Sequence, residues 1–135
     1  MSVRTKLCGA VLLLGALCNA SAAWDTTAVE PSQVIYHDKS TRTKDSQFVT
    51  MWTMTDFAAA RTEEFGTFQS FSSKDVFDCS KKRHAFVVAQ FYTDKLGGGK
   101  LLHTIQKDEK YLEWAAIAPR TTSEKEWKIA CQNAE

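Results

Sequence analysis

The sequence has no apolar run long enough to cross a membrane and no excess of either charge. The apolar stretch Leu7–Leu17 is far shorter than the roughly 20 residues that a membrane-spanning helix needs. Across 135 residues, 17 lysines and arginines face 16 aspartates and glutamates, which leaves a formal net charge of +1. This balance produces no field that attracts polyanions, so nucleic acid is excluded as the expected partner. Internal repeats and low-complexity tracts are also absent, which indicates one ordinary folded domain.

The first residues have the organisation of an export signal. Arg4 and Lys6 precede the apolar stretch, and the small residues of Asn19–Ala23 follow it. A basic start, a short apolar segment and small residues at the cleavage point are typical of a cleavable signal peptide. We therefore predict a signal peptide over residues 1–22 and an exported mature chain that is located in the periplasm or at the cell surface.

A lipid anchor on Cys18 is not favoured by the residues around it. A bacterial lipoprotein signal has a small residue directly before the lipidated cysteine, and Leu17 occupies that position here. We therefore predict export without a lipid anchor, and an anchored form remains the alternative. Mass spectrometry of the exported protein distinguishes the two.

Only two cysteines remain once the predicted signal peptide is removed. Cys8 and Cys18 lie within that segment, which leaves Cys79 and Cys131. An exported protein folds in an oxidising compartment, where a lone pair of cysteines most simply forms a disulfide. The bond would close a loop of about 53 residues and stabilise the fold by about 4 kcal/mol in the chain-entropy treatment.

Alternation of apolar and polar residues predicts an antiparallel sheet. The strongest signal is Phe48–Phe57, where threonine and aromatic residues suit a half-buried, pleated surface. Residues 38–47 predict a solvated loop, residues 58–66 a connector, and residues 23–32 a loosely held N-terminal arm. The expected strands are Gln33–His37, Phe48–Phe57, Thr67–Cys79, Lys82–Thr93 and Leu101–Gln106, and a last extended or mixed segment is expected over Tyr111–Ala118.

The chain ends in a predicted helix. Ser123 and Glu126 have the spacing of a capping box. Four residues recur at helical spacing and would share one face: Trp127, Ala130, Cys131 and Ala134. A helix this short is marginal by itself, so it must dock on the sheet. These features predict an α+β fold in a single domain over residues 33–135. The domain is expected to be an antiparallel β-sheet of about five or six strands with a short C-terminal helix docked on it and held by a disulfide.

The chain resembles the bacterial surface-adhesin protein E domain family from about Gln33 to Cys131. The segments that carry the resemblance are Tyr36-x-Asp38-x-Ser40, Val49-Thr50-Met51-Trp52, Asp56-Phe57, Ser70-Phe71-Ser72-Ser73, Phe77-Asp78-Cys79, Lys82-Arg83, Trp114 ahead of Pro119, and Trp127-Lys128-x-Ala130-Cys131. The chain departs from the family pattern at Asp45-Ser46, where members usually have a glycine. The resemblance implies an antiparallel sheet with a C-terminal helix tied to its concave side, and homodimers in at least some members.

The resemblance also implies a non-enzymatic binding module of the bacterial envelope. The family takes its name from a surface lipoprotein that binds host matrix and serum proteins, so proteins are the expected partners. A second hypothesis is a periplasmic structural or stress-related protein that binds another envelope component. The weak lipid-anchor signal favours the second hypothesis, and the family name favours the first. The shared fold does not decide between them, because a fold does not by itself carry a function.

No motif for catalysis, metal binding or a cofactor is present. The spacing of His37, His84 and His103 matches no metal-ligand pattern. Residues 97–100 resemble a phosphate loop, but the leading glycine and the hydroxyl residue that binds magnesium are missing, so a hairpin turn is predicted. The serines of 70–73 lack the surroundings of a nucleophile. We therefore predict neither an enzyme nor a cofactor.

Basic residues form the one candidate binding surface. They are Lys39, Arg42, Lys44, Lys81, Lys82 and Arg83. If they gather on one edge, they could bind acidic matrix polymers or heparin-like ligands. Alternatively, lysines at the start of a strand keep a sheet edge solvated and block pairing with other chains. The sequence leaves both interpretations open.

Overall fold

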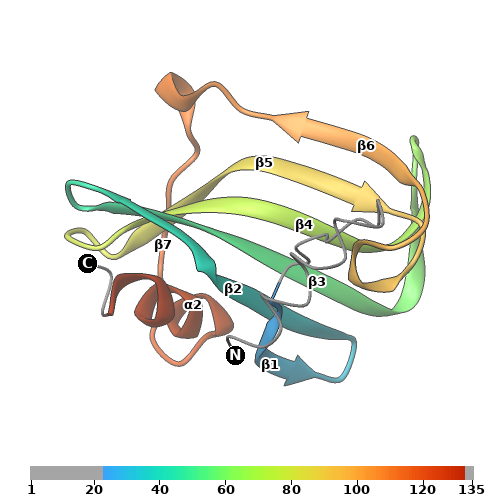
Figure 1. Cartoon of the computed structure of the whole chain (residues 1–135), viewed down its shortest axis with the longest axis horizontal. Coiled ribbons are helices and arrows are strands. Elements are labelled where there is room, and N and C mark those ends of the chain that lie inside the picture. The colour runs from blue at the N-terminus through green and yellow to red at the C-terminus, as the bar shows by residue number, and fades with distance from the viewer. Residues whose placement is uncertain (1–22, 133–135) are drawn as a thin grey trace, which may run out of the picture.

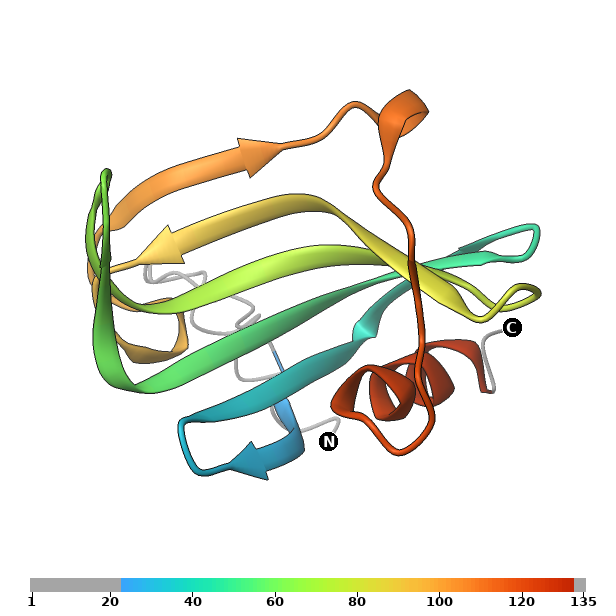
Figure 2. The same ribbon diagram turned by 180° about the vertical axis from the view of Figure 1, so that it is seen from behind.

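The computed structural model describes residues 23–132, which form one antiparallel sheet and one α-helix (Figure 1). The elements are β1 (Asp25–Glu30), β2 (Gln33–Asp45), β3 (Phe48–Glu63), β4 (Gly66–Asp78), β5 (Arg83–Tyr92), the 3-10 turn η2 (Lys95–Gly97), β6 (Leu101–Gln106), the 3-10 turn η3 (Glu109–Tyr111), β7 (Ala115–Ala116) and α2 (Thr122–Cys131). The strands follow one another in the order β1-β2-β3-β4-β5-β6, and β7 pairs with β5. The sheet curls into a half-barrel with α2 against its concave side, which confirms the predicted fold class (Figures 1 and 2).

The main core lies between α2 and the concave face of the sheet. Its fully buried members are Val49 and Met51 of β3, Phe77 of β4 and Ala130 of α2. Val49 and Met51 alternate along β3 and therefore point to the same face. Trp127 packs against this cluster from the helix. The helical spacing of Trp127 and Ala130 thus predicted the docked face correctly.

The opposite face of the sheet is covered by the chain between β6 and β7. The buried residues on this side are Val76, Ala85 and Val87. Leu112 and Trp114 pack against them. The chain then pairs as β7 with the first residues of β5 and passes to α2 on the other side of the sheet (Figure 2). This crossing places the helix under the half-barrel.

Three segments differ from their predicted structure. Residues 25–30, expected in a loosely held arm, form β1 and pair with β2. Most of the predicted loop at 38–47 belongs to β2, and most of the predicted connector at 58–66 belongs to β3. Backbone hydrogen bonds to the neighbouring strands hold these extensions, while many of their side chains remain exposed. Alternation of apolar and polar residues does not reveal such strand ends. A strand needs apolar residues only where another part of the chain covers one of its faces, and the side chains of these ends are largely exposed.

The helix begins earlier than the predicted capping box. Thr121 is the N-cap residue, and its Oγ1 accepts a hydrogen bond from the backbone N–H of Glu124 at 3.2 Å. Ser123 lies inside the helix, so the prediction of a cap by Ser123 and Glu126 is wrong. Glu126 is instead one of the buried residues of α2.

The glycine-rich turn between β5 and β6 forms the predicted hairpin. Gly97 and Gly99 have φ angles of +71° and +72°. A Cβ atom at Gly99 would lie 2.1 Å from Oγ1 of Thr93. Only glycine satisfies both the backbone conformation and the close approach at this position.

Three predictions concern residues outside the described part of the chain. They are the signal peptide over residues 1–22, the expected lack of a lipid anchor on Cys18, and the place of Ala134 on the helix face. Within the described residues, no helix is both long enough and apolar enough to span a membrane.

Candidate functional site

The predicted disulfide is confirmed and joins the residue that follows β4 to the last residue of α2. The Sγ atoms of Cys79 and Cys131 lie 2.06 Å apart, and their Cα atoms 5.7 Å apart. Arg42 of β2 donates to the backbone carbonyls of Ile129 at 3.1 Å and of Gln132 at 2.9 Å. These bonds satisfy carbonyl groups that the end of a helix leaves unpaired. A covalent bond and a charged side chain therefore fix the end of α2 to the sheet.

The turn between β4 and β5 is built around the fully buried carboxylate of Asp78. One oxygen accepts from the backbone N–H groups of Ser80 at 3.1 Å and Lys81 at 3.0 Å, and the other accepts from Nε of Arg83 at 2.9 Å. Burial alone would raise the pKa of Asp78, but these hydrogen bonds and one from Gln47 outweigh it and leave the pKa below its ordinary value. Asp78 thus organises the turn as an ionised acceptor.

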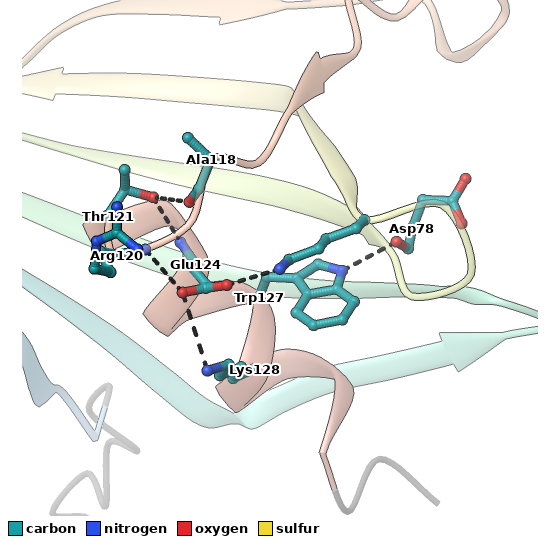
Figure 3. A network of polar contacts seen from close by, with 8 residues as sticks. Asp78, Ala118, Arg120, Thr121, Glu124, Trp127 and Lys128 are labelled. Carbon is teal, nitrogen blue, oxygen red and sulfur yellow. Dashed lines mark hydrogen bonds and ion pairs between the residues drawn. The ribbon is translucent and has the colours of Figure 1, made fainter.

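The first turns of α2 are held against the same region by polar contacts (Figure 3). Nε1 of Trp127 donates to the backbone carbonyl of Asp78 at 3.0 Å. Nζ of Lys82 lies 2.7 Å from Oε2 of Glu124, and the backbone N–H of Arg120 donates to Oε1 at 3.0 Å. The hydrogen bonds from Lys82 and Arg120 lower the pKa of Glu124 to about 2. An ionised Glu124 therefore links the start of the helix to the β4–β5 turn.

The six basic residues predicted as a binding surface divide into two groups. Three are engaged within the chain by the contacts just described: Arg42, Lys82 and Arg83. Three have exposed side chains: Lys39, Lys44 and Lys81. Phe48 of β3 pairs with Asp78 of β4, so the β2–β3 and β4–β5 turns lie at the same end of the sheet (Figure 1). The fold therefore brings Lys44 and Lys81 to one end, and binding by these residues stays a prediction.

The three histidines lie on different strands and have different neighbours. His37 of β2 is buried with Nδ1 2.7 Å from Oγ1 of Thr27, and burial lowers the pKa of its ring. His84 of β5 and His103 of β6 each stack on a phenylalanine ring. Among residues 23–132, no three histidine, cysteine or acidic side chains are grouped as metal ligands.

A cavity of about 360 Å³ lies between the N-terminal half of α2 and the concave face of the sheet. Three carboxyl groups line it, Glu30 from β1, Asp75 from β4 and Glu126 from α2. The rings of Phe71 and Phe86 contribute apolar wall, and no lysine or arginine lines the cavity. Its volume lies within the range of about 300–1,000 Å³ that is common for small-ligand sites.

Two of these carboxyl groups are held away from bulk solvent. Asp75 accepts hydrogen bonds from Thr53 at 2.9 Å and Ser73 at 2.6 Å, and burial raises its pKa. Glu126 is only 8% exposed, and burial, together with the charges of Asp75 and Glu30, raises its pKa to about 8. The cavity therefore holds two neighbouring carboxyl groups whose pKa values are both raised, so they keep a proton to higher pH than exposed acids do.

The chain matches a known family over nearly all of its described residues. The family model for surface-adhesin protein E matches residues 24–132. The chain belongs to this family. The match includes every strand of the sheet, the helix α2 and both cysteines of the disulfide. The resemblance inferred from the motifs is therefore confirmed.

Solved structures of protein E from Haemophilus influenzae share the fold of this family member. One crystal form is 16% identical, has a TM-score of 0.57, and covers 85% of this chain and 98% of the other. The structure from the non-typeable organism is also 16% identical, with a TM-score of 0.60 and coverage of 85% and 79%. Likeness at this identity shows the fold alone. No curated protein matches the chain.

Sequence reasoning did not find the acidic cavity of this family member. Glu126 was assigned to a helix cap, and Asp75 was not singled out. The sequence contains two indications of this cavity. Glu126 precedes Ala130 by one helical turn, and Asp75 alternates with Phe77 along β4. Each carboxyl group therefore shares a face with a core residue, which is unusual for an acid that has no ion-pair partner among the described residues.

Proposed function

We propose that this chain is an exported, non-enzymatic binding module that acts as an adhesin at the bacterial cell surface. The observation that carries this proposal is the match to surface-adhesin protein E over residues 24–132. The predicted signal peptide over residues 1–22 supports export. The disulfide-tethered helix supports a rigid binding surface, and a surface ordered before binding loses less conformational entropy when a partner docks.

The end of the sheet that carries Lys44 and Lys81 is the binding surface we propose, with Lys39 on the same strand as Lys44. All three side chains are exposed, and Lys81 extends from a turn that buried Asp78 holds in place. Exposed lysines on a fixed turn favour acidic partners, such as acidic patches on host proteins or sulfated matrix polymers. Arg83 supports this surface indirectly, because it is the ion-pair partner of Asp78.

Protease digestion of intact cells tests the location. Digestion of the protein in intact cells, with a periplasmic marker protected, is the result expected for an adhesin. Protection until the outer membrane is permeabilised would refute surface exposure and would support the alternative, a periplasmic protein that binds another envelope component.

Retention on heparin and on immobilised matrix proteins tests the binding surface. The double variant Lys44→Ala/Lys81→Ala is expected to elute from the resin at lower salt than the parent protein. The variant lacks two lysine contacts with the acidic ligand, so less salt is needed to screen the contacts that remain. The matched control is Lys95→Ala/Lys100→Ala, which removes two exposed lysines at the opposite end of β5. Equal loss of retention in both variants would show that net charge, and not this surface, determines binding. Light scattering on the same preparation measures whether the protein is the homodimer that the family resemblance implies.

A further inference from the structure

The cavity beneath α2 contains a buried acid that the rest of the fold does not use. Glu126 is 8% exposed and lines the cavity. No described residue forms a hydrogen bond or an ion pair with it, whereas Asp75 and Glu30 both accept hydrogen bonds from neighbouring hydroxyl groups. An unpaired buried carboxyl group is costly to a fold, so its retention needs a reason.

The remaining surface of the cavity has two kinds of wall. The rings of Phe71 and Phe86 and the side chain of Ile35 are apolar, and the acidic groups lie on β1, β4 and α2. His84 of β5 is the only residue with a basic side chain among the lining residues. A ligand that fits must therefore carry positive charge at one point and apolar surface elsewhere.

We propose that this cavity binds an alkylammonium group, with the ammonium between Glu126 and Asp75 and the methylene chain against Phe71 and Phe86. An ammonium group donates three hydrogen bonds and accepts none, which matches a site of carboxyl oxygens. Small organic amines and the lysine side chain of a partner protein share this chemistry. The inference goes beyond the adhesive function and does not depend on it.

Binding of an ammonium group must displace the proton of Glu126. The groups that face Glu126 are Asp75 from β4, Glu30 from β1 and His84 from β5. An alkylammonium ion keeps its own charge up to a pKa of about 10, so the carboxyl group is the group that loses a proton. The apparent affinity therefore rises about tenfold per pH unit below the pKa of Glu126, which is about 8, and then levels off.

Calorimetric titration of the purified protein tests the proposal with three probes. Pentylamine represents a free amine, N-acetyl-lysine amide represents a partner's side chain, and pentanol is the uncharged control. We expect both amines to bind with proton release and pentanol not to bind. Tighter binding of pentylamine would indicate a small-molecule ligand, and equal or tighter binding of the blocked lysine would indicate a partner protein.

The variant Glu126→Gln separates this site from general charge effects. It keeps the shape of the side chain and cannot ionise, so it is expected to fold. Its affinity for both amines should fall at least about tenfold at neutral pH, and the pH dependence should weaken to the part that Asp75 contributes. Glu63→Gln, an exposed site at the end of β3, is the matched control and should leave affinity unchanged. No amine binding at millimolar concentration, equal binding of pentanol, or unchanged affinity in Glu126→Gln would overturn the proposal.

Discussion

Replacing Glu126 by glutamine should stabilise the protein, and the gain should grow as the pH rises. The pKa of Glu126 is about 8 in the folded protein, against an ordinary value of 4.5. Between these values the folded protein holds a proton that the unfolded chain has lost. The free energy of unfolding therefore falls as the pH rises through this window and becomes constant above it.

The size of the effect follows from the two pKa values. At about 1.4 kcal/mol for each pH unit, a carboxyl pKa raised from 4.5 to about 8 corresponds to about 5 kcal/mol when the loss is complete. That is comparable with the whole stability of a small domain, about 5–15 kcal/mol. Glutamine cannot ionise, so Glu126→Gln should raise the free energy of unfolding by about 1 kcal/mol or less near pH 5 and by several kcal/mol near pH 8.

Urea denaturation followed by tryptophan fluorescence at a series of pH values measures this gain. Trp127 lies on the same helix, so its fluorescence is part of the signal. Some pH dependence should remain in Glu126→Gln, because burial also raises the pKa of Asp75. The exposed control Glu63→Gln should change stability little at any pH. A gain that is the same near pH 5 and near pH 8 would refute the reasoning, since it could not arise from ionisation of Glu126.

Two further predictions concern the contacts that hold α2. Reduction of the disulfide, or Cys131→Ser, should lower the free energy of unfolding by about 4 kcal/mol. Hydrogen exchange should then increase in α2 before it increases in the sheet. Equal stability with and without reductant would contradict this prediction. Arg83→Ala should lower the free energy of unfolding by about 1.5–3 kcal/mol in thermal or urea denaturation, because it removes the ion-pair partner of buried Asp78. Lys81→Ala is the control and should change this free energy little, because Lys81 contacts Asp78 only through its backbone.

Local patterns in the sequence predicted the parts of the fold that depend on near neighbours. Alternation located the centres of the strands, and helical spacing located the docked face of α2 through Trp127 and Ala130. The strand ends were missed because backbone pairing with an adjacent strand extends them without an apolar pattern. The helix start was missed because Ser123 and Thr121 both have the chemistry of a cap, and only the path of the chain selects Thr121.

The candidate sites show the same division. The six basic residues were recognised by type, but their roles differ according to what lies beside them in space. Lys82 reaches Glu124 across 42 positions of the sequence, and Arg42 reaches the end of α2 across 87. Lys44 and Lys81 have no such partner among the described residues and remain exposed. Composition and spacing do not distinguish an engaged lysine from a free one.

The sequence by itself determined the disulfide pairing, the docked helix face and the family. Each of these depends on residues that are few or regularly spaced: two cysteines outside the predicted signal peptide, one helical stripe and one ordered set of motifs. Only the tertiary structure decided that Asp75 and Glu126 share a cavity. Their meeting depends on the register of β4, the curl of the sheet and the crossing that brings α2 beneath it, and each of these is set by contacts between residues far apart in the chain.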